Sequence, residues 1–376
     1  MIKVINVISD TNIGGAGRLL LTYLAHADKE NFDISVVLPK NSLLKPHLET
    51  LCIKFFEIDA MSDKSLDFKA ISELKEIFKR EKPDIVHSHA SMSARIAARS
   101  VGCKVIYTRH SVFPPSPYIS KGIGKKINGA VNNYYADGII AVAEAAKQNL
   151  LDTGVCEDKI KVILNGVEPL NVSSEEKKAK TRKLFNISDD EKVVAIVARL
   201  NPVKGHEYFI RAAKIVSDAG INAKFIVAGT GDIMDSLKQL ASEINISDKI
   251  VFAGFVDDVE SLMNICDIQI NASYGTEATS LSLLEGMSLG VAAVVSDFGG
   301  NPGVISDGQN GFIVPQKDPQ AIADAIIKLF SDDSLMESIK NGAKEVFAQK
   351  FTAEIMSRNI ENYYVQILDN GGNKNE

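Results

Sequence analysis

The feature that most constrains the fold is an alternation of short apolar runs, rich in β-branched residues, with longer stretches of helical spacing. Continuous apolar runs are typical of parallel strands covered on both faces. Between residues 2 and 167 they fall at Ile2–Ser9, Ile34–Pro39, Ile53–Asp59, Asp84–His89, Lys104–His110, Gly138–Ala143 and Lys161–Leu164. This alternation predicts an open parallel sheet with helices on both sides.

The pattern lapses once and then restarts. Residues 168–192 are polar and charged, with one proline, and this stretch predicts an interdomain linker. Apolar runs resume at Val193–Arg199, Lys224–Ala228, Ile250–Gly254, Ile268–Ser273, Val291–Ser296 and Phe312–Val314. We therefore expect two doubly wound, Rossmann-like α/β domains that face each other across a cleft, with the carboxyl ends of both sets of strands toward it.

The domain boundaries follow from these patterns. We expect a first domain over 1–168, a linker over 169–191 and a second domain over 192–350. A last helix over 351–368 is expected to pack back toward the first domain. The tail at 369–376 is too polar to order itself.

Charge and composition exclude several classes of function and partner. Lys and Arg number 42 against 48 Asp and Glu, a net charge of -6, and no basic block is large enough for a nucleic acid partner. The sequence has neither an Asp-x-Asp pair nor closely spaced cysteines, so we expect no metal and no other cofactor. No apolar run approaches the ~20 residues of a membrane span, and the N-terminus lacks a cleavage-site pattern, which favours the cytoplasm.

Two glutamates stand out after the strand candidate that ends at Ser273. If a helix begins just after Glu277, at about Thr279, and runs to Leu289, its first backbone N–H groups have no partner and favour a phosphate. These groups belong to Ala278, Thr279, Ser280 and Leu281. Glu285 would then lie roughly 12 Å further along the helix axis. From spacing alone, both glutamates could equally be solvated helix charges.

The Glu-x7-Glu element, with Glu285-Gly-Met-Ser-Leu-Gly290 at its end, resembles the retaining glycosyltransferases of GT-B fold called group one or family four. The resemblance covers nearly the whole chain. It implies that Glu277 binds the donor hexose as a catalytic residue and that Glu285 binds the ribose. It also assigns Arg199 and Lys204, in a loop similar to the family's Gly-Arg-Leu-x-x-x-Lys-Gly, to the donor diphosphate, where negative charge grows as the glycosidic bond breaks.

Further donor-binding residues rest on the same resemblance. Gly14 and Gly15 match a Gly-Gly loop near the diphosphate and the acceptor, and the loop lacks the third glycine of a dinucleotide fingerprint. Gly229 matches a glycine turn, and Val256 a loop under the nucleobase. His110 corresponds to a histidine that contacts the donor hexose near the reaction centre. His87 and His89 end another strand; only one is expected to face the cleft, and His89 is predicted to bind the acceptor.

Two departures from the family pattern are present. Residues 278–280, Ala-Thr-Ser, replace a frequent Gly-Phe-Gly, which keeps the backbone donors and adds hydroxyl groups, and Gly303 stands where an acidic residue is common. The segment 109–126 mixes prolines, aromatic residues and cations. Two interpretations stay open for it: peripheral contact with anionic lipid on the inner membrane face, or a mobile acceptor loop beside a solvated helix.

The sequence thus predicts a cytoplasmic, metal-independent, retaining hexosyltransferase that uses a nucleotide sugar, most simply a UDP-sugar, and a saccharide or lipid-linked acceptor. Two alternatives stay open. One is a UDP-sugar 2-epimerase, which shares this architecture and needs no second substrate. The other is a non-catalytic partner subunit that binds sugar nucleotide without turnover.

Overall fold

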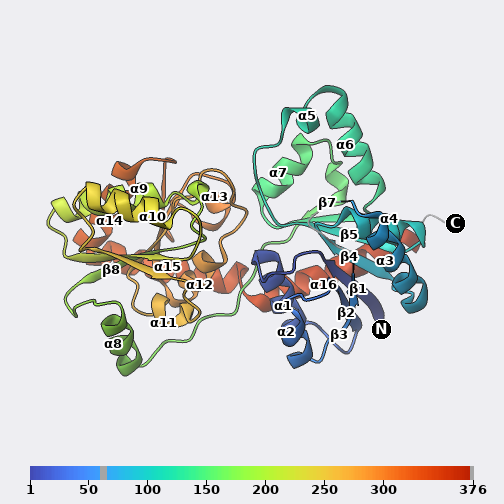
Figure 1. The fold of residues 1–376 in the computed structure, drawn as a ribbon, viewed down its shortest axis with the longest axis horizontal. Coiled ribbons are helices and arrows are strands. Elements are labelled where there is room, and N and C mark those ends of the chain that lie inside the picture. Colours follow the sequence, from blue (N-terminus) through green and yellow to red (C-terminus); the bar gives the residue numbers. More distant parts are fainter. Residues whose placement is uncertain (60–65, 373–376) are drawn as a thin grey trace. The chain divides into compact units, whose positions relative to one another are not determined.

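Two parallel sheets organise the part of the chain that the computed structural model describes, residues 1–59 and 66–372 (Figure 1). The chain divides into two units. Unit 1 comprises Met1–Gly166 and the C-terminal segment from Ala353, and unit 2 comprises Val167–Thr352. The predicted two-domain α/β architecture is confirmed.

Within the described residues, the sheet of unit 1 has seven strands in the order β3-β2-β1-β4-β5-β6-β7. All neighbours are parallel, because a helical crossover connects each strand to the next. The strands are β1 Ile2–Ile8, β2 Phe32–Pro39, β3 Lys54–Ile58, β4 Ile85–His89, β5 Lys104–Arg109, β6 Gly138–Ala141 and β7 Ile160–Val162. The strand order reverses between β1 and β4, where Ile5 lies in register with Val86.

The helices of unit 1 include one from the far end of the chain. They are α1 Gly15–His26, α2 Lys45–Thr50, α3 Phe68–Glu81, α4 Met92–Ser100, α5 Pro117–Ser120, α6 Gly122–Tyr134, α7 Glu144–Asp152 and α16 Ala353–Gly372. In α16, Tyr364 is fully buried, with its ring centroid 6.2 Å from that of Tyr23 in α1. The helix extends into the tail predicted at 369–376, of which residues 373–376 lie outside the described residues.

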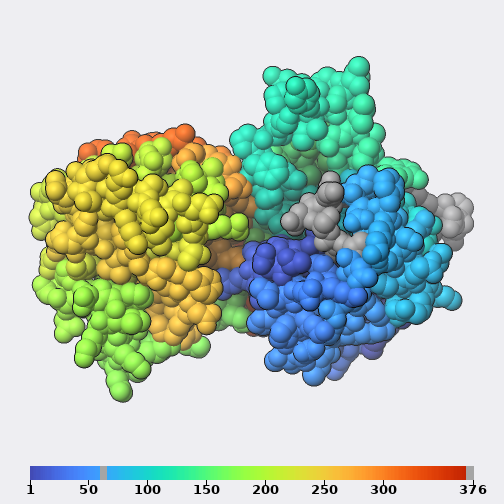
Figure 2. All heavy atoms as spheres, in the orientation of Figure 1, coloured from blue at the N-terminus to red at the C-terminus, as the bar shows by residue number. Residues whose placement is uncertain are grey.

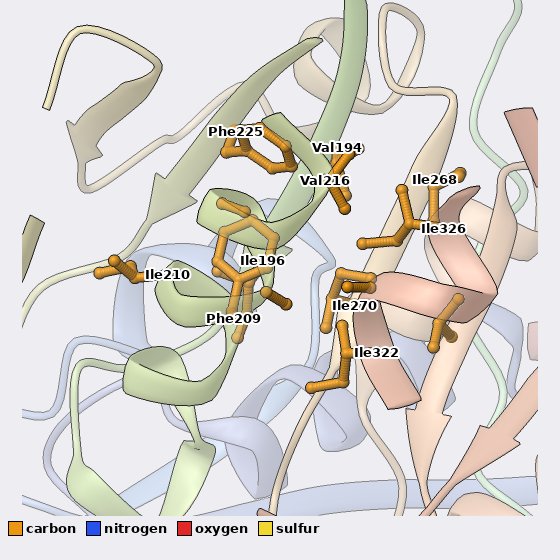
Figure 3. Packing of buried hydrophobic residues seen from close by; sticks show 14 of the residues in the cluster. Val194, Ile196, Phe209, Ile210, Val216, Phe225, Ile268, Ile270, Ile322 and Ile326 are labelled. Carbon is orange, nitrogen blue, oxygen red and sulfur yellow. The ribbon is translucent and has the colours of Figure 1, made fainter. Parts of the chain in front are cut away.

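Unit 2 repeats the arrangement. Its sheet has the order β10-β9-β8-β11-β12-β13 and reverses between β8 and β11. The strands are β8 Lys192–Val197, β9 Ala223–Ala228, β10 Ile250–Gly254, β11 Ile268–Asn271, β12 Ala292–Ser296 and β13 Phe312–Val314. Figure 3 shows the core on one face of this sheet, where Val194 and Ile268 of the strands pack with Phe209 and Ile326 of the helices.

The remaining helices surround this sheet. They are α8 Glu175–Leu184, α9 His206–Asp218, α10 Met234–Glu243, α11 Val259–Met263, α12 Leu281–Leu289, α13 Asn301–Val304, α14 Pro319–Ser331 and α15 Asp333–Lys350. The stretch predicted as a linker contains α8, which the structure assigns to unit 2. The Ser174 hydroxyl caps it by accepting from Lys177 N at 3.3 Å. Its residues are mostly exposed, so the sequence is polar although the segment is a helix.

Candidate active site

The carboxyl ends of β8 and β11 meet where the strand order of unit 2 reverses. Ligands in open α/β sheets bind at such a point. After β8 the chain forms a short 3-10 turn, Pro202–Lys204, and after β11 it leads to Glu277. Two residues with separately predicted roles are thereby brought to the same edge of the sheet.

Lys204 and Glu277 form an ion pair. Lys204 Nζ donates to Glu277 Oε2 at 2.8 Å and to the carbonyl oxygen of Thr276 at 3.1 Å. Asn271 Nδ2 and Ser273 Oγ donate to the same carboxylate oxygen at 3.2 and 3.0 Å. The Glu277 side chain is 8% exposed. In the described part of the chain no donor contacts Oε1, so one oxygen anchors the carboxylate and the other remains for a further hydrogen bond.

The backbone around Glu277 is held equally closely. Gly300 N donates to the carbonyl oxygen of Glu277 at 3.1 Å. Gly299 has φ +60°, and a Cβ there would lie 2.1 Å from that oxygen, so only glycine fits. Sequence reasoning missed Asn271, Ser273 and this glycine pair. Their positions could have indicated a role, because Asn271 is the last residue of β11 and Gly299 follows β12.

Glycines also bring the neighbouring loops together. Gly229 follows β9 with φ +140°, and a Cβ there would lie 2.0 Å from the carbonyl oxygen of Ala198. Gly205, at the start of α9, has φ +75°, and its Cβ would lie 2.1 Å from the carbonyl oxygen of Ala272. The loops after β8, β9 and β11 are therefore in backbone contact, which positions the Lys204 turn.

Arg199 and Val256 lie in different environments. Arg199 is exposed on the loop after β8, and no other described residue forms an ion pair with it. Its guanidinium is thus available to a ligand. Val256, after β10, packs against a buried apolar cluster that includes Ile187 and Leu262. The residue before it, Phe255, is 75% exposed at the end of the strand.

α12 begins later than predicted. The backbone N–H groups that lack a partner within the helix are therefore different ones. Ser280 is the N-cap and its hydroxyl accepts from Leu283 N at 3.3 Å, as serine favours this position. The first helical residue is Leu281, so Ala278 and Thr279 precede the helix instead of forming its first turn. Glu285 is buried in α12 and lies about 6 Å along the axis from Leu281, since only that stretch is helical.

In unit 1, Gly14 and Gly15 form the start of α1, directly after the β1 loop. Gly14 is the N-cap, without a side-chain cap, and the first turn has no acidic residue. A Cβ at Gly15 would meet nothing within 4 Å. At Gly14 a Cβ would lie 3.2 Å from Asp10 Oδ2, so a carboxylate already lies at this helix N-terminus, which favours negative charge.

Three histidines line a cavity of about 30 Å³ in unit 1. The expectation that only one of His87 and His89 points toward the site is wrong, because side chains two apart on a strand share a face. Their ring centroids are 4.4 Å apart. The ring of His110, just after β5, stacks on His89 with centroids 5.2 Å apart.

A chain of hydrogen bonds sets the tautomers of two of these rings. His89 Nε2 lies 3.1 Å from Asn6 Oδ1 and donates to it in this orientation of the amide, which places the proton of His89 on Nε2. His89 Nδ1 then accepts from His110 Nε2 at 2.9 Å. His110 Nδ1 is left as a buried acceptor with no partner among the described residues. Both nitrogens of His89 are used, which leaves none for the acceptor substrate that the sequence assigned to it.

Burial keeps all three rings neutral. It lowers the pKa of His110 to about 4. Burial, with a smaller effect from His110, lowers the pKa of His87 to about 3. The pKa of His89 is also held well below its ordinary value, mainly by burial. His87 is fixed separately, by the hydroxyl oxygens of Tyr364 at 2.7 Å and Thr108 at 2.6 Å.

The described residues contain no group of three or more His, Cys, Asp or Glu side chains arranged to hold a metal ion. None of their helices combines the length and apolar character needed to cross a bilayer.

Comparisons with known proteins agree across the chain. The profile of Glycosyltransferase Family 4 matches residues 13–169, and that of Glycosyl transferases group 1 matches 177–346. An uncharacterized glycosyltransferase of Methanocaldococcus jannaschii is 31% identical over 298 residues, 76% of this chain and 75% of the relative. The UDP-Gal:alpha-D-GlcNAc-diphosphoundecaprenol alpha-1,3-galactosyltransferase of Escherichia coli is 25% identical and covers 98% of each chain.

Among solved structures, Anabaena HepE in complex with UDP-glucose superposes with a TM-score of 0.85 at 21% identity, over 97% of this chain and 100% of that one. Such a likeness shows the shared fold, with two parallel sheets in series. The two family profiles together span both units. The chain belongs to the group-one, family-four glycosyltransferases and has the GT-B fold.

Proposed function

We propose that the enzyme transfers a hexosyl unit from a UDP-sugar to a saccharide or lipid-linked acceptor, with retention of configuration and without a metal. The observation that carries the proposal is the Lys204–Glu277 pair at the strand-order reversal of unit 2. The relatives support the donor class: HepE holds UDP-glucose, and the Escherichia coli enzyme is named for UDP-galactose. That name also supports a lipid-linked acceptor.

Charge on the leaving diphosphate rises as the glycosidic bond breaks, so preorganised cations and N–H groups lower the barrier. Lys204 and the exposed Arg199 would supply the cations, and the backbone at the start of α12 the N–H groups. Gly14 and Gly15, at the start of α1, would admit the diphosphate to a second helix N-terminus. These groups would take the place of a metal.

Retention would proceed by attack on the face that the leaving group departs from. The acceptor oxygen forms a bond to the anomeric carbon, the bond from that carbon to the diphosphate oxygen breaks, and the acceptor proton moves to a phosphate oxygen. Glu277 would bind the hexose through Oε1, and His110 would orient the sugar. Glu285 would hold the ribose. A lipid-linked acceptor would bring the enzyme to the cytoplasmic face of a membrane.

A panel of nucleotide sugars, each incubated with and without saccharide and polyprenyl-diphosphate acceptors, tests the proposal. We expect release of UDP that depends on an acceptor, a product of unchanged anomeric configuration by NMR, and a rate insensitive to chelator. Conversion of a UDP-sugar alone would indicate an epimerase, and UDP binding without turnover a partner subunit. Chelator inactivation that magnesium or manganese reverses would exclude the metal-free mechanism.

A further inference from the structure

The apolar face of α6 points outward. Ile123, Ile127, Val131 and Tyr134 recur at three- and four-residue spacing and so share one side of the helix. That side is exposed, at 76% for Ile123, 59% for Ile127 and 62% for Tyr134. A surface helix ordinarily buries its apolar stripe against the core. Here the stripe faces solvent.

The inner side of α6 is polar and rich in glycine. Asn128 Nδ2 donates to the carbonyl oxygen of Thr153 at 2.7 Å, and Asn132 Oδ1 accepts from an arginine of α4 at 3.0 Å. A Cβ at Gly129 would lie 2.1 Å from the carbonyl oxygen of Gly154. Rotating the helix to bury its isoleucines would break these bonds and force side chains into that backbone contact. The outward direction of the apolar face is therefore built into the fold.

α5 extends the same surface. Tyr118 is 88% exposed and Ile119 39% exposed. Figure 1 and Figure 2 show α5 and α6 as a projection at one end of unit 1, drawn in teal. The α5–α6 surface is defined here as the exposed apolar side chains of these two helices.

The charged residues of the segment that contains α5 and α6 are all basic. No acidic residue occurs between Arg109 and Asp137, although the chain as a whole carries a net charge of -6. Lys121, Lys125 and Lys126 flank the apolar face, and within the described residues none of the three forms an ion pair. Apolar side chains ringed by lysines match a surface with an apolar interior and anionic headgroups.

We propose that the α5–α6 surface docks on an anionic lipid bilayer. The inference rests on the proposed function only in that it places the enzyme where a lipid-linked acceptor would lie. A second copy of the chain fits the surface less well, because a two-fold contact through this face would set the lysines of one copy against the same lysines of the other.

The test is sedimentation of the full-length protein with vesicles of phosphatidylcholine, alone or with one-third phosphatidylglycerol. We expect binding to the anionic vesicles at least tenfold tighter. Ile123→Asp combined with Ile127→Asp should weaken that binding at least tenfold. Leu184→Asp, at a leucine of α8 with the same 76% exposure, should leave it unchanged. Lys125→Gln combined with Lys126→Gln should weaken it about 25-fold, about fivefold for each lysine.

Equal binding to both vesicle types would overturn the proposal, as would a Leu184 variant that loses binding like the isoleucine variant. Dimers in solution that the isoleucine variant dissociates, with no vesicle binding by the wild type, would instead identify an interface between copies. Circular dichroism and calorimetry with UDP on each variant separate docking from folding and from the donor site. If the transferase activity fails and vesicle binding holds, only the proposed function is wrong.

Discussion

Lys204 Nζ and Glu277 Oε2 lie 2.8 Å apart and join two loops that 73 residues of chain separate. The carboxylate is nearly buried, so the lysine neutralises a charge that would otherwise be costly inside the protein. In the proposed donor site, the diphosphate would pair with the same Lys204 ammonium group. Lys204 would then contact both the diphosphate and Glu277, so this one side chain would link the diphosphate to the residue that binds the hexose.

Replacing Lys204 with methionine should destabilise unit 2. The change leaves the Glu277 carboxylate buried without its cation, which costs about 3 kcal/mol when one partner of a buried pair is removed. Lys204→Met with Glu277→Gln should recover most of that loss, because no charge is then left, whereas turnover should be absent in both variants. Urea unfolding measures the free energies. Equal stability of the single variant and the wild type would show that the ion pair is not formed.

Arg199→Ala should behave differently from the lysine variant. Its side chain is exposed and has no ion-pair partner in the described part of the chain, so unfolding should change by less than about 0.5 kcal/mol. UDP affinity should still fall by about 2 kcal/mol, as when a charged hydrogen bond to the diphosphate is lost. Calorimetric titration with UDP is the measurement, and an unchanged affinity would remove Arg199 from the donor site.

Substitutions of Glu277 and Glu285 should have different effects on the kinetic constants. In the proposed donor site Glu285 binds the ribose in every state, so Glu285→Gln should mainly raise the donor KM and weaken UDP binding. Glu277→Gln should mainly lower kcat, because contacts to the hexose strengthen as the anomeric bond breaks. UDP has no hexose, so its affinity should stay near that of the wild type in the Glu277 variant. The reverse ranking of UDP affinities would mean that the donor lies in the opposite direction.

Asn6→Leu should act on His110 through His89. Without the Asn6 oxygen, His89 is free to carry its proton on Nδ1, and it then no longer accepts from His110. We expect nitrogen NMR to show mixed tautomers of both rings, with kcat about tenfold lower and the donor KM little changed. Asn6→Asp keeps an acceptor at this position and should keep the wild-type tautomer. A single tautomer in the leucine variant would contradict the relay.

Acid should destabilise unit 1 through its buried histidines. The pKa of His110 is lowered to about 4 and that of His87 to about 3 in the folded protein, against about 6.5 when unfolded. Between these values the unfolded chain binds more protons. The free energy of unfolding should therefore fall as pH decreases from about 6.5 toward 4, by about 1.4 kcal/mol per pH unit for each such histidine.

Urea unfolding at several pH values from 7 to 5 checks this slope. His87→Gln should reduce it by the share of one histidine. A stability that does not vary with pH in this range would show that these rings are accessible to protons.

Sequence reasoning found the strands because a strand covered on both faces needs a continuous apolar run, as in Val193–Val197, and the alternation with helices then fixes parallel pairing. It singled out Lys204 and Glu277 because the motifs around them resemble those of the family, and in the structure both follow strands at the reversal of strand order. It did not foresee that they bind each other. That contact depends on how closely two distant loops approach, and the glycine contacts of Gly205 and Gly299 set this distance only in the folded chain.

Two further predictions differ from the structure: the start of α12 and the directions of the His87 and His89 side chains. Several residues before α12 could start the helix. The hydroxyl of Ser280 accepts from Leu283 N and lies 3.0 Å from that of Ser282, which donates to the carbonyl oxygen of Val197 on a distant strand, so tertiary contacts accompany this start. The wrong prediction for His87 and His89 has a different cause. Period-two geometry places His87 and His89 on one face, but Asn6, which fixes the second ring, comes from a neighbouring strand and gives no signal in the local sequence.

The position of α16 determines the order in which the chain can fold during synthesis. Unit 1 lacks Tyr364, which packs against Tyr23 and His87, until synthesis has passed the whole of unit 2. Unit 2 is one uninterrupted segment, Val167–Thr352, and becomes available as a whole earlier. Translation normally lets the N-terminal domain fold first. In this protein the unit that is synthesised second is complete first, and a chain that ends at residue 352 contains all of unit 2 but lacks α16 of unit 1.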